Sequence, residues 1–252
     1  STQAKTLFPY TTLFRSMTGS STVPLAYLHT LHARGVPVGQ VYGTTETGPL
    51  SIVLRLPDAV ARVGASGWPQ PEAQVKLIDT QGQEVGVGAT GEVCIRAANL
   101  MRGYWPGDGS TAPQAGLGLQ DGWFHTGDLG QCAQDGCITI VGRSKDMVIS
   151  GGENIYPAEI ENLLVTLPGV SECAVIGLPD ARWGEVPVAV LVRSANAAGQ
   201  ALSEAQVLSH LQARIARFKL PRRVVWRDQL PKSALGKVQK PALQAELLRT
   251  NP

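Results

Sequence analysis

The sequence has little of what marks several large classes of protein. Only 6% of its 252 residues are aromatic, 17% are charged, and the formal net charge is +2. A surface dedicated to nucleic acid needs a larger excess of Lys and Arg, so no nucleic-acid partner is expected. No run reaches the ~20 apolar residues that span a bilayer, and no charged-then-apolar secretion signal opens the chain. The composition is that of an ordinary globular protein, and the chain is long enough for one or two domains.

Cysteine is also scarce. The four cysteines are Cys94, Cys132, Cys137 and Cys173, and their spacing fits no Cys-x-x-Cys metal pattern. A disulfide framework is not expected in a chain of this size. We therefore expect reduced thiols and a cytoplasmic location. Glycine, by contrast, is frequent at 28 residues, which predicts many turns and close backbone approaches.

The first residues lack a helical or strand period. The stretch "TLFPYTTLFRS" looks like the conceptual translation of a sequencing adapter. We expect residues 1–16 to be artefactual, and we exclude them from reasoning about the fold. On that interpretation the true upstream part of the protein is missing.

The rest of the chain divides into two patterns. Residues 22–34 predict a short helix, 35–43 a buried strand, and 64–104 a small antiparallel sheet or barrel, followed by a loop over 106–122 and a strand at 137–143. Helical and strand patterns then alternate. Helices are predicted at 157–167, 203–215 and 241–248, and strands at 172–177, 186–192 and 222–226. The second helix is expected to begin with a Ser-x-x-Gln capping box at Ser203 and Gln206 and to place Leu208, Leu211 and Ile215 on one face. The expected domains are therefore 17–144 and 145–252.

Two polar turns could carry chemistry. In "VYGTTETG", Tyr42 could stack on a base, the threonines could donate to a phosphate, and Glu46 could bind Mg²⁺. By itself this short motif favours a turn with solvated polar residues. In "WFHTGDLG", Asp128 could accept hydrogen bonds from a ribose diol or merely close a turn. His125 is interpreted as a packing or loop residue.

Two later segments add candidate residues. In "VGRSKDMVISGGENIYPAEIE", Arg143 could bind a phosphate or ribose, and Gly151 and Gly152 allow either close backbone approach or a tight turn. Glu159 and Glu161 are interpreted as a solvated helix start. In "PKSALGKVQK", a lysine, Lys237, follows a glycine in a short turn, which for most loops means a solvated surface.

Together and in this order, these segments resemble the adenylate-forming superfamily: acyl-CoA synthetases, adenylation domains of peptide synthetases and luciferases. The resemblance is carried by "YGTTE", "HTGDLG", "GRSKDMVISGGENIYPAEIE", "GLPDARWGE" and "PKSALGKVQK". It runs from about residue 17 to the end and covers the C-terminal half of such an enzyme. It implies an α/β and α+β multidomain fold, in which the remnant of a large adenylating domain with a small β-barrel subdomain precedes a mobile α+β C-terminal domain.

The resemblance also implies roles. In this family ATP and a carboxylic acid form an acyl-adenylate, and a thiol then displaces AMP. Tyr42 would stack on adenine, Thr45 would contact phosphate and Glu46 would hold Mg²⁺. Asp128 would bind the ribose, helped by Arg143. Further nucleotide or pocket contacts would come from Gly19, Ser20, Ser21, Gly43 and Thr44.

The remaining implied roles concern movement. Lys145 occupies the family's hinge position. Lys237 would enter the site for adenylation, and the Gly151–Gly152 loop would replace it when the thiol arrives. Lys232 and Lys240 are interpreted as surface charges.

The branch most similar is the acyl-CoA synthetases, which implies ATP, Mg²⁺, coenzyme A and a free carboxylic acid as partners. Fatty, aromatic and small dicarboxylic acids all stay open. The family's Ser/Thr/Gly-rich phosphate loop ending in Pro-Lys is absent, since none follows "MTGSST". We therefore expect this chain alone to be inactive. The alternatives are a non-catalytic AMP-binding fragment, or an adenylating enzyme with a carrier-protein or oxygen acceptor.

Overall fold

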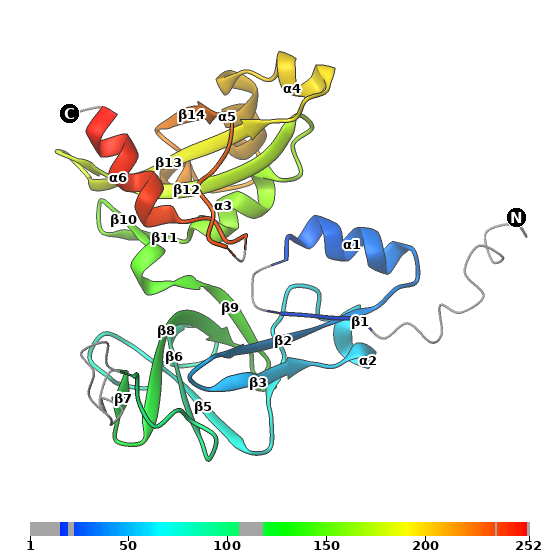
Figure 1. Ribbon diagram of the computed structural model, residues 1–252, viewed down its shortest axis with the longest axis vertical. Helices are drawn as coiled ribbons and strands as arrows, with labels where there is room; N and C mark the ends of the chain where they lie inside the picture. The colour runs from blue at the N-terminus through cyan, green and yellow to red at the C-terminus, as the bar shows by residue number, and fades with distance from the viewer. Residues whose placement is uncertain (1–15, 20–22, 106–117, 235, 251–252) are drawn as a thin grey trace, which may run out of the picture. The chain divides into compact units, whose positions relative to one another are not determined.

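The computed structural model describes residues 16–19, 23–105, 118–234 and 236–250 (Figure 1). Nearly all of the suspected adapter segment, as well as Ser20, Ser21 and most of the expected 106–122 loop, lie outside these ranges. The chain separates into two compact units, Ser1–Ile140 and Val141–Pro252, here called unit 1 and unit 2. The boundary expected from the sequence, between residues 144 and 145, lies four positions further along.

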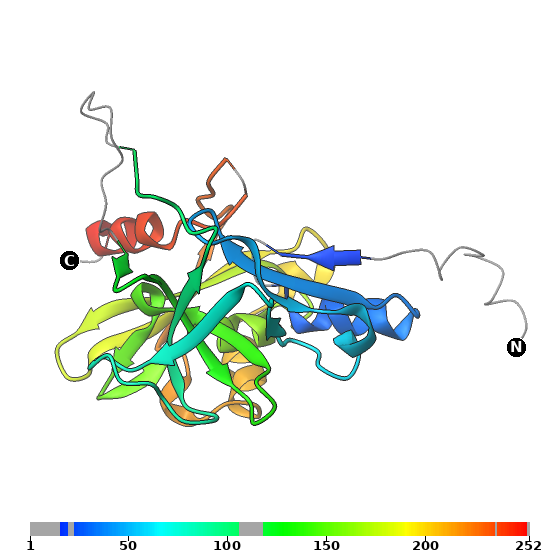
Figure 2. The ribbon, with the colours of Figure 1, turned by 90° about the horizontal axis from the view of Figure 1, so that it is seen from below.

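The first sheet of unit 1 is built around a hairpin. Its order is β1-β2-β3-β4, with β1 parallel to β2 and the other pairs antiparallel. The strands β2 and β3 lie side by side in Figures 1 and 2. The four strands are Ser16–Thr18, Val38–Thr44, Gly48–Leu54 and Trp68–Pro69. The helices of this unit are α1, Leu25–Ala33, which follows Pro24 and buries Leu28, and the short α2, Leu56–Ala59.

The second sheet of unit 1 confirms the predicted antiparallel region. It runs β5-β6-β8-β7, with β9 paired to β8. Its strands are Ala73–Ile78 (β5), Thr90–Ala97 (β6), Leu119–Gln120 (β7), Trp123–Cys132 (β8) and Ile138–Arg143 (β9). Along β6 the fully buried Val93 and Ile95 join the core of Ile52, Leu77 and Ile138. Their neighbours Glu92 and Cys94 point to the opposite face, as the two-residue period of a strand requires.

Unit 2 has one sheet with helices on both faces. The order is β11-β10-β13-β12, and β14 pairs parallel to β13. The strands are β10 Val148–Ser150, β11 Glu153–Ile155, β12 Val170–Asp180, β13 Gly184–Arg193 and β14 Arg223–Arg227. The helices are α3 Pro157–Leu164, α4 Ala197–Ala201, α5 Glu204–Gln212 and α6 Lys240–Thr250, with 3-10 turns η1 Ser144–Asp146 and η2 Arg217–Lys219.

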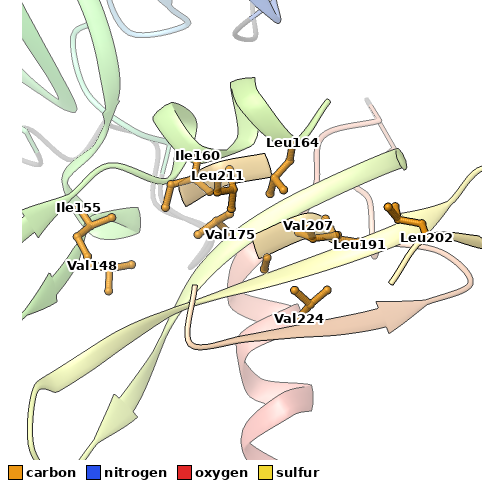
Figure 3. Close-up of a cluster of buried hydrophobic side chains, with 11 residues drawn as sticks. Val148, Ile155, Ile160, Leu164, Val175, Leu191, Leu202, Val207, Leu211 and Val224 are labelled. Atoms are coloured by element: carbon orange, nitrogen blue, oxygen red, sulfur yellow. The ribbon is translucent and has the colours of Figure 1, made fainter. Parts of the chain in front are cut away.

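Two hydrophobic clusters hold this unit together. Figure 3 shows the first, in which α3 and α5 pack on the sheet through residues such as Ile160, Leu164 and Leu211. The second lies under α6, whose Leu243 and Leu247 contact the alternate positions of β12 and β13. Each fully buried Leu or Ile stabilises the fold by about 1.5–3 kcal/mol. The predicted α+β character of the C-terminal region is confirmed.

Some local predictions are confirmed and others are wrong. The capping box of Ser203 and Gln206 is present at the start of α5. However, α5 buries Val207 and not Leu208, because it rotates to place Val207 in the first cluster. Among the described residues, no helix is long and apolar enough to cross a membrane.

The helix start at Glu159 and Glu161 is not merely solvated. Glu159 forms an ion pair with Lys219 at 2.7 Å. Glu161 accepts a hydrogen bond from the backbone N–H of Val175 and pairs with Lys240, both at 2.7 Å. Lys240 is therefore not a simple surface charge, since its side chain is only 19% exposed and joins α6 to α3.

Candidate nucleotide site

The β2–β3 turn places Thr45 and Glu46 at the tip of a hairpin. A Cβ on Gly43 would collide with the carbonyl of Gly48, so glycine is required where the two strands approach. Gly48 itself has a φ of 78°. The buried Thr47 closes the turn, because its Oγ1 accepts the Thr44 N–H at 3.0 Å. Thr45 is exposed and Glu46 is half-buried at the tip.

The segment after β6 braces this hairpin. The N–H of Met101 donates to the Glu46 carbonyl at 2.8 Å, and the Asn99 amide donates to the Thr47 carbonyl at 3.2 Å. The Tyr104 hydroxyl donates to Glu46 Oε1 at 2.8 Å, and this hydrogen bond raises the pKa of Tyr104. The sequence pattern does not predict this support, because nothing in it links residues more than fifty positions apart.

Tyr42 and Asp128 meet although 86 positions separate them. The Tyr42 hydroxyl donates to Asp128 Oδ2 at 2.8 Å. Tyr42 lies on β2 and Asp128 on β8, so the contact joins the two sheets of unit 1. Asp128 is only 6% exposed. Two of the predicted site residues are thus brought together around a nearly buried carboxylate.

An irregularity in β8 directs Asp128 toward Tyr42. Between the pairs Glu92–Leu129 and Cys94–His125, β6 advances two residues whereas β8 advances four. The extra residues form a bulge in which Gly127 has a φ of 69°. Thr126 Oγ1 holds the bulge by donating to the Val93 carbonyl at 2.7 Å and accepting the Asp128 N–H at 3.1 Å.

A second polar group borders this bulge. His125 Nδ1 lies 3.2 Å from Glu92 Oε2, and the other oxygen of Glu92 accepts the Gly127 N–H at 3.0 Å. Cys94 Sγ lies 3.6 Å from the same His125 nitrogen. Burial, followed by the charge of Glu92, raises the pKa of Cys94 to about 11. His125 therefore has specific partners, which corrects its interpretation as a packing or loop residue.

In unit 2, Lys237 lies on a preformed hairpin. An isolated bridge pairs Lys232 with Val238, and the Ser233 N–H donates to the Lys237 carbonyl at 2.8 Å. Ser233 Oγ accepts the Lys237 N–H at 3.2 Å, and Gly236 turns with a φ of 77°. The Lys237 residue is exposed, and within the described residues it forms no ion pair. Lys232 instead pairs with Glu172 at 2.7 Å.

The Gly-Gly pair forms the turn between β10 and β11. Gly151 and Gly152 have φ angles of 59° and 89°, and they separate the paired residues Ser150 and Glu153. Two positive φ angles in a two-residue hairpin favour glycine at both positions. The Gly151 N–H donates to the Trp183 carbonyl at 2.8 Å, and the Trp183 ring covers Gly151 closely. The tight-turn interpretation is confirmed, and both glycines stay exposed.

The other candidates lie near the ends of elements. Gly19 follows β1, and a Cβ there would meet Val41 of β2. Arg143 ends β9, and Lys145 lies in η1; both are exposed. Unit 1 thus holds Tyr42, the Thr44–Glu46 tip and Asp128. Unit 2 holds Arg143, Lys145, Gly151, Gly152 and Lys237.

Comparison with known proteins identifies the family. A model of the AMP-binding enzyme family matches residues 4–105, and a model of the AMP-binding enzyme C-terminal domain matches residues 159–237. The chain belongs to the AMP-binding enzyme family. The resemblance noted from the motifs is confirmed. The first match begins inside residues 1–16, whose adapter origin stays a prediction.

Relatives of the chain include acyl-CoA ligases. It is 46% identical over 223 residues to the indoleacetate–CoA ligase of Aromatoleum aromaticum, spanning 88% of this chain and 42% of that ligase. ATP-bound MatB from Rhodopseudomonas palustris matches with a TM-score of 0.81 and 36% identity, over 94% of this chain and 46% of that one.

A third match carries both nucleotide and metal. The o-succinylbenzoate coenzyme A synthetase of Bacillus subtilis, in complex with ATP and a magnesium ion, matches with a TM-score of 0.78 and 32% identity. The match covers 90% of this chain and 45% of that one. The chain therefore spans less than half the length of each of the three proteins.

Proposed function

We propose that this chain is the C-terminal half of a carboxylic acid–CoA ligase. In the proposed reaction a carboxylate attacks the α-phosphate of ATP, and pyrophosphate leaves. The thiol of coenzyme A then attacks the acyl carbon, and AMP leaves. The observation that carries the proposal is the Tyr42–Asp128 hydrogen bond, which joins two separate motifs around one nearly buried carboxylate.

The nucleoside end is assigned to unit 1. A carboxylate offers about four acceptor positions, so Asp128 can accept from a ribose diol while it accepts from Tyr42. The hydrogen bond fixes the orientation of the phenol ring, on which adenine would stack. Gly43 permits the close strand approach that positions Tyr42 and Thr44. Gly19, Ser20 and Ser21 are assigned to the pocket wall, and Arg143 is assigned to the ribose.

The phosphate end is assigned to the hairpin tip. Thr45 presents an exposed hydroxyl for a phosphate oxygen. Glu46 would hold Mg²⁺, and a carboxylate on a braced turn fits this hard cation. The bound ion would neutralise phosphate charge. The Tyr104 hydroxyl keeps the Glu46 carboxylate oriented.

Lys237 is assigned to adenylation. Negative charge develops where the carboxylate meets the α-phosphorus, and a positioned donor there contributes about 2.7–4 kcal/mol. The hairpin fixes the Lys237 backbone while its side chain stays exposed. With Lys145 as the hinge, movement of unit 2 would bring Gly151 and Gly152 to the site for the thiol step. Two exposed glycines leave room for a narrow thiol substrate.

The substrate acid is proposed only as a carboxylic acid, because the relatives named above differ in theirs. We also propose that the 252-residue chain alone does not release AMP, since its sequence holds no Ser/Thr/Gly-rich loop followed by Pro-Lys. A cytoplasmic location stays a prediction. The competing function is a non-catalytic AMP-binding module.

The test begins with a long, adapter-free read of the source DNA upstream of the Met17 codon. If an open frame supplies the phosphate loop, the joined protein is assayed for AMP release that depends on the acid. The panel contains indoleacetate, o-succinylbenzoate and a long-chain fatty acid. Coenzyme A and a carrier protein are compared as acceptors.

The joined protein then carries Lys237→Ala, with Lys232→Ala from the same hairpin as its control. Lys237→Ala is expected to lower AMP release by at least a hundredfold, because about 2.7–4 kcal/mol of stabilisation is lost. It should spare thioester formation from a supplied acyl-adenylate. Equal loss of both half-reactions rejects the role of Lys237. AMP binding without acid-dependent turnover in the joined protein rejects the ligase and favours the binding module.

A further inference from the structure

Three side chains of different chemistry gather on the second sheet of unit 1, on the face opposite Val93 and Ile95. Cys94 on β6 and His125 on β8 are cross-strand partners, and Glu92 lies two residues before Cys94 on the same face. Their ligand atoms, one thiol sulfur, one ring nitrogen and one carboxylate oxygen, all lie within 4.8 Å of one another. The proposed ligase chemistry uses none of the three.

The spacing suits a tetrahedral metal ion. Zinc binds sulfur at about 2.3 Å and nitrogen or oxygen at about 2.0–2.2 Å, which places neighbouring ligand atoms of a tetrahedron about 3.2–3.6 Å apart. Cys94 Sγ and His125 Nδ1 are 3.6 Å apart, and His125 Nδ1 and Glu92 Oε2 are 3.2 Å apart. The ion can therefore enter between the ligand atoms with little movement.

The second oxygen of Glu92 is already used to support the group. It accepts the Gly127 N–H at 3.0 Å, and this hydrogen bond fixes the orientation of the carboxylate. Such outer hydrogen bonds commonly orient metal-binding carboxylates. The side chains of His125 and Glu92 are 22% and 28% exposed, so two of the three ligands can be reached from solvent, whereas Cys94 is buried.

We propose that Glu92, Cys94 and His125 bind a borderline-soft divalent cation of the zinc class, with water as the fourth ligand. One thiolate and one carboxylate balance the two charges of the ion. Mixed sulfur, nitrogen and oxygen ligands favour zinc over magnesium or calcium, which take oxygen ligands. The site is separate from Glu46, to which the nucleotide-associated Mg²⁺ is assigned.

Two features of the face weaken the binding. The Cys94 thiol must release its proton to solvent when the metal–sulfur bond forms, and its raised pKa of about 11 opposes that release. Lys76, the cross-strand partner of Cys94 on β5, adds a positive charge to the same face. Its ammonium lies 4.6 Å from the Trp123 ring centre, and Arg96 stacks on that ring at the same distance. Affinity should therefore increase when the positive charge of Lys76 is removed.

Cobalt(II) titration of the chain tests the site, because cobalt takes zinc positions and its bond to a thiolate absorbs strongly. We expect a charge-transfer band that saturates at one ion per chain and is abolished by competing zinc. Cys94→Ser should lose the band, and Glu92→Gln should weaken binding at least tenfold. Cys137→Ser, which alters another buried free thiol of unit 1, is the matched control and should keep the band. Lys76→Gln should tighten binding severalfold.

A folding defect in Cys94→Ser does not obscure the result, because Glu92→Gln and Lys76→Gln shift affinity in opposite directions. Absence of the band in the unaltered chain overturns the proposal. So does an equal band in the Cys94→Ser variant, or cobalt affinity that is unchanged in both Glu92→Gln and Lys76→Gln.

Discussion

Replacing Tyr42 with Phe removes one hydroxyl and leaves the ring in place. That hydroxyl donates to Asp128 at 2.8 Å, and the receiving carboxylate is only 6% exposed. A hydrogen bond to a charged group contributes about 1.5–3 kcal/mol, and the higher part of that range applies when the acceptor stays away from water. We therefore expect Tyr42→Phe to destabilise unit 1 by about 2 kcal/mol.

Tyr104→Phe is the matched control. The Tyr104 hydroxyl donates to Glu46 over the same 2.8 Å, but Tyr104 is 41% exposed. Water can replace the lost hydrogen bond at this exposed position, so Tyr104→Phe should change the free energy of unfolding of unit 1 by no more than about 0.5 kcal/mol. The two variants differ in burial and share the chemical change, which isolates the effect of the buried carboxylate.

Native-state hydrogen exchange followed by mass spectrometry reports on each unit separately. Protection of the β8 amides should fall in Tyr42→Phe, while that of β13 in unit 2 should not change. A double-mutant cycle with Asp128→Asn should return a coupling of at least about 1 kcal/mol. Equal effects of the two tyrosine substitutions, or a cycle without coupling, would refute the role assigned to this contact.

Two further predictions concern backbone crowding and a buried thiol. Gly43→Ala should destabilise unit 1 by about 1–3 kcal/mol in the same exchange experiment, because the new methyl meets the Gly48 carbonyl, whereas Gly86→Ala, where a Cβ meets open space, should be nearly neutral. Burial, followed by Glu161, raises the pKa of Cys173 to about 12. Because the unfolded thiol ionises near pH 9 and the folded one does not, this group lowers the stability of unit 2 by about 1.4 kcal/mol per pH unit above pH 9. Urea unfolding between pH 8 and 10.5 should show that the free energy of unfolding falls less steeply with pH in Cys173→Ala than in the unaltered chain. Identical slopes would reject the raised pKa of Cys173.

Local signals in the sequence predicted local structure well. The Ser203–Gln206 box, the alternation along β6 and the turn at Gly151–Gly152 each depend on a few neighbouring residues. The buried face of α5 could not be predicted from the sequence alone. Leu208 and Val207 are both apolar, and only packing against the sheet determines that Val207 is the buried one. A helical period predicts an apolar stripe, but its edge is decided by the partner surface.

The candidate site needed long-range contacts that spacing does not reveal. The motifs around Tyr42 and Asp128 could be recognised, but their hydrogen bond depends on a bulge that inserts two residues into β8. Glu92 and Cys94 belong to no recognisable motif, and their contacts with His125 depend on the register between β6 and β8. Glu161 was misread for a similar reason, since its partners Val175 and Lys240 lie on other elements.

The three lysines between residues 231 and 240 differ in their contacts, and this difference allows the role proposed for Lys237 to be tested. Lys232 pairs with Glu172 and so ties the hairpin to β12, whereas Lys240 at the start of α6 pairs with Glu161 of α3. Lys237 is exposed, and within the described residues it makes no ion pair. Its substitution should therefore leave the stability of unit 2 within about 0.5 kcal/mol, as for other exposed positions. Lys240→Ala, by contrast, strips the partner from the half-buried Glu161 and should destabilise the unit by more. If Lys237→Ala blocks AMP release in the joined protein without changing its urea unfolding, while Lys240→Ala changes unfolding, the effect at Lys237 belongs to chemistry and not to folding.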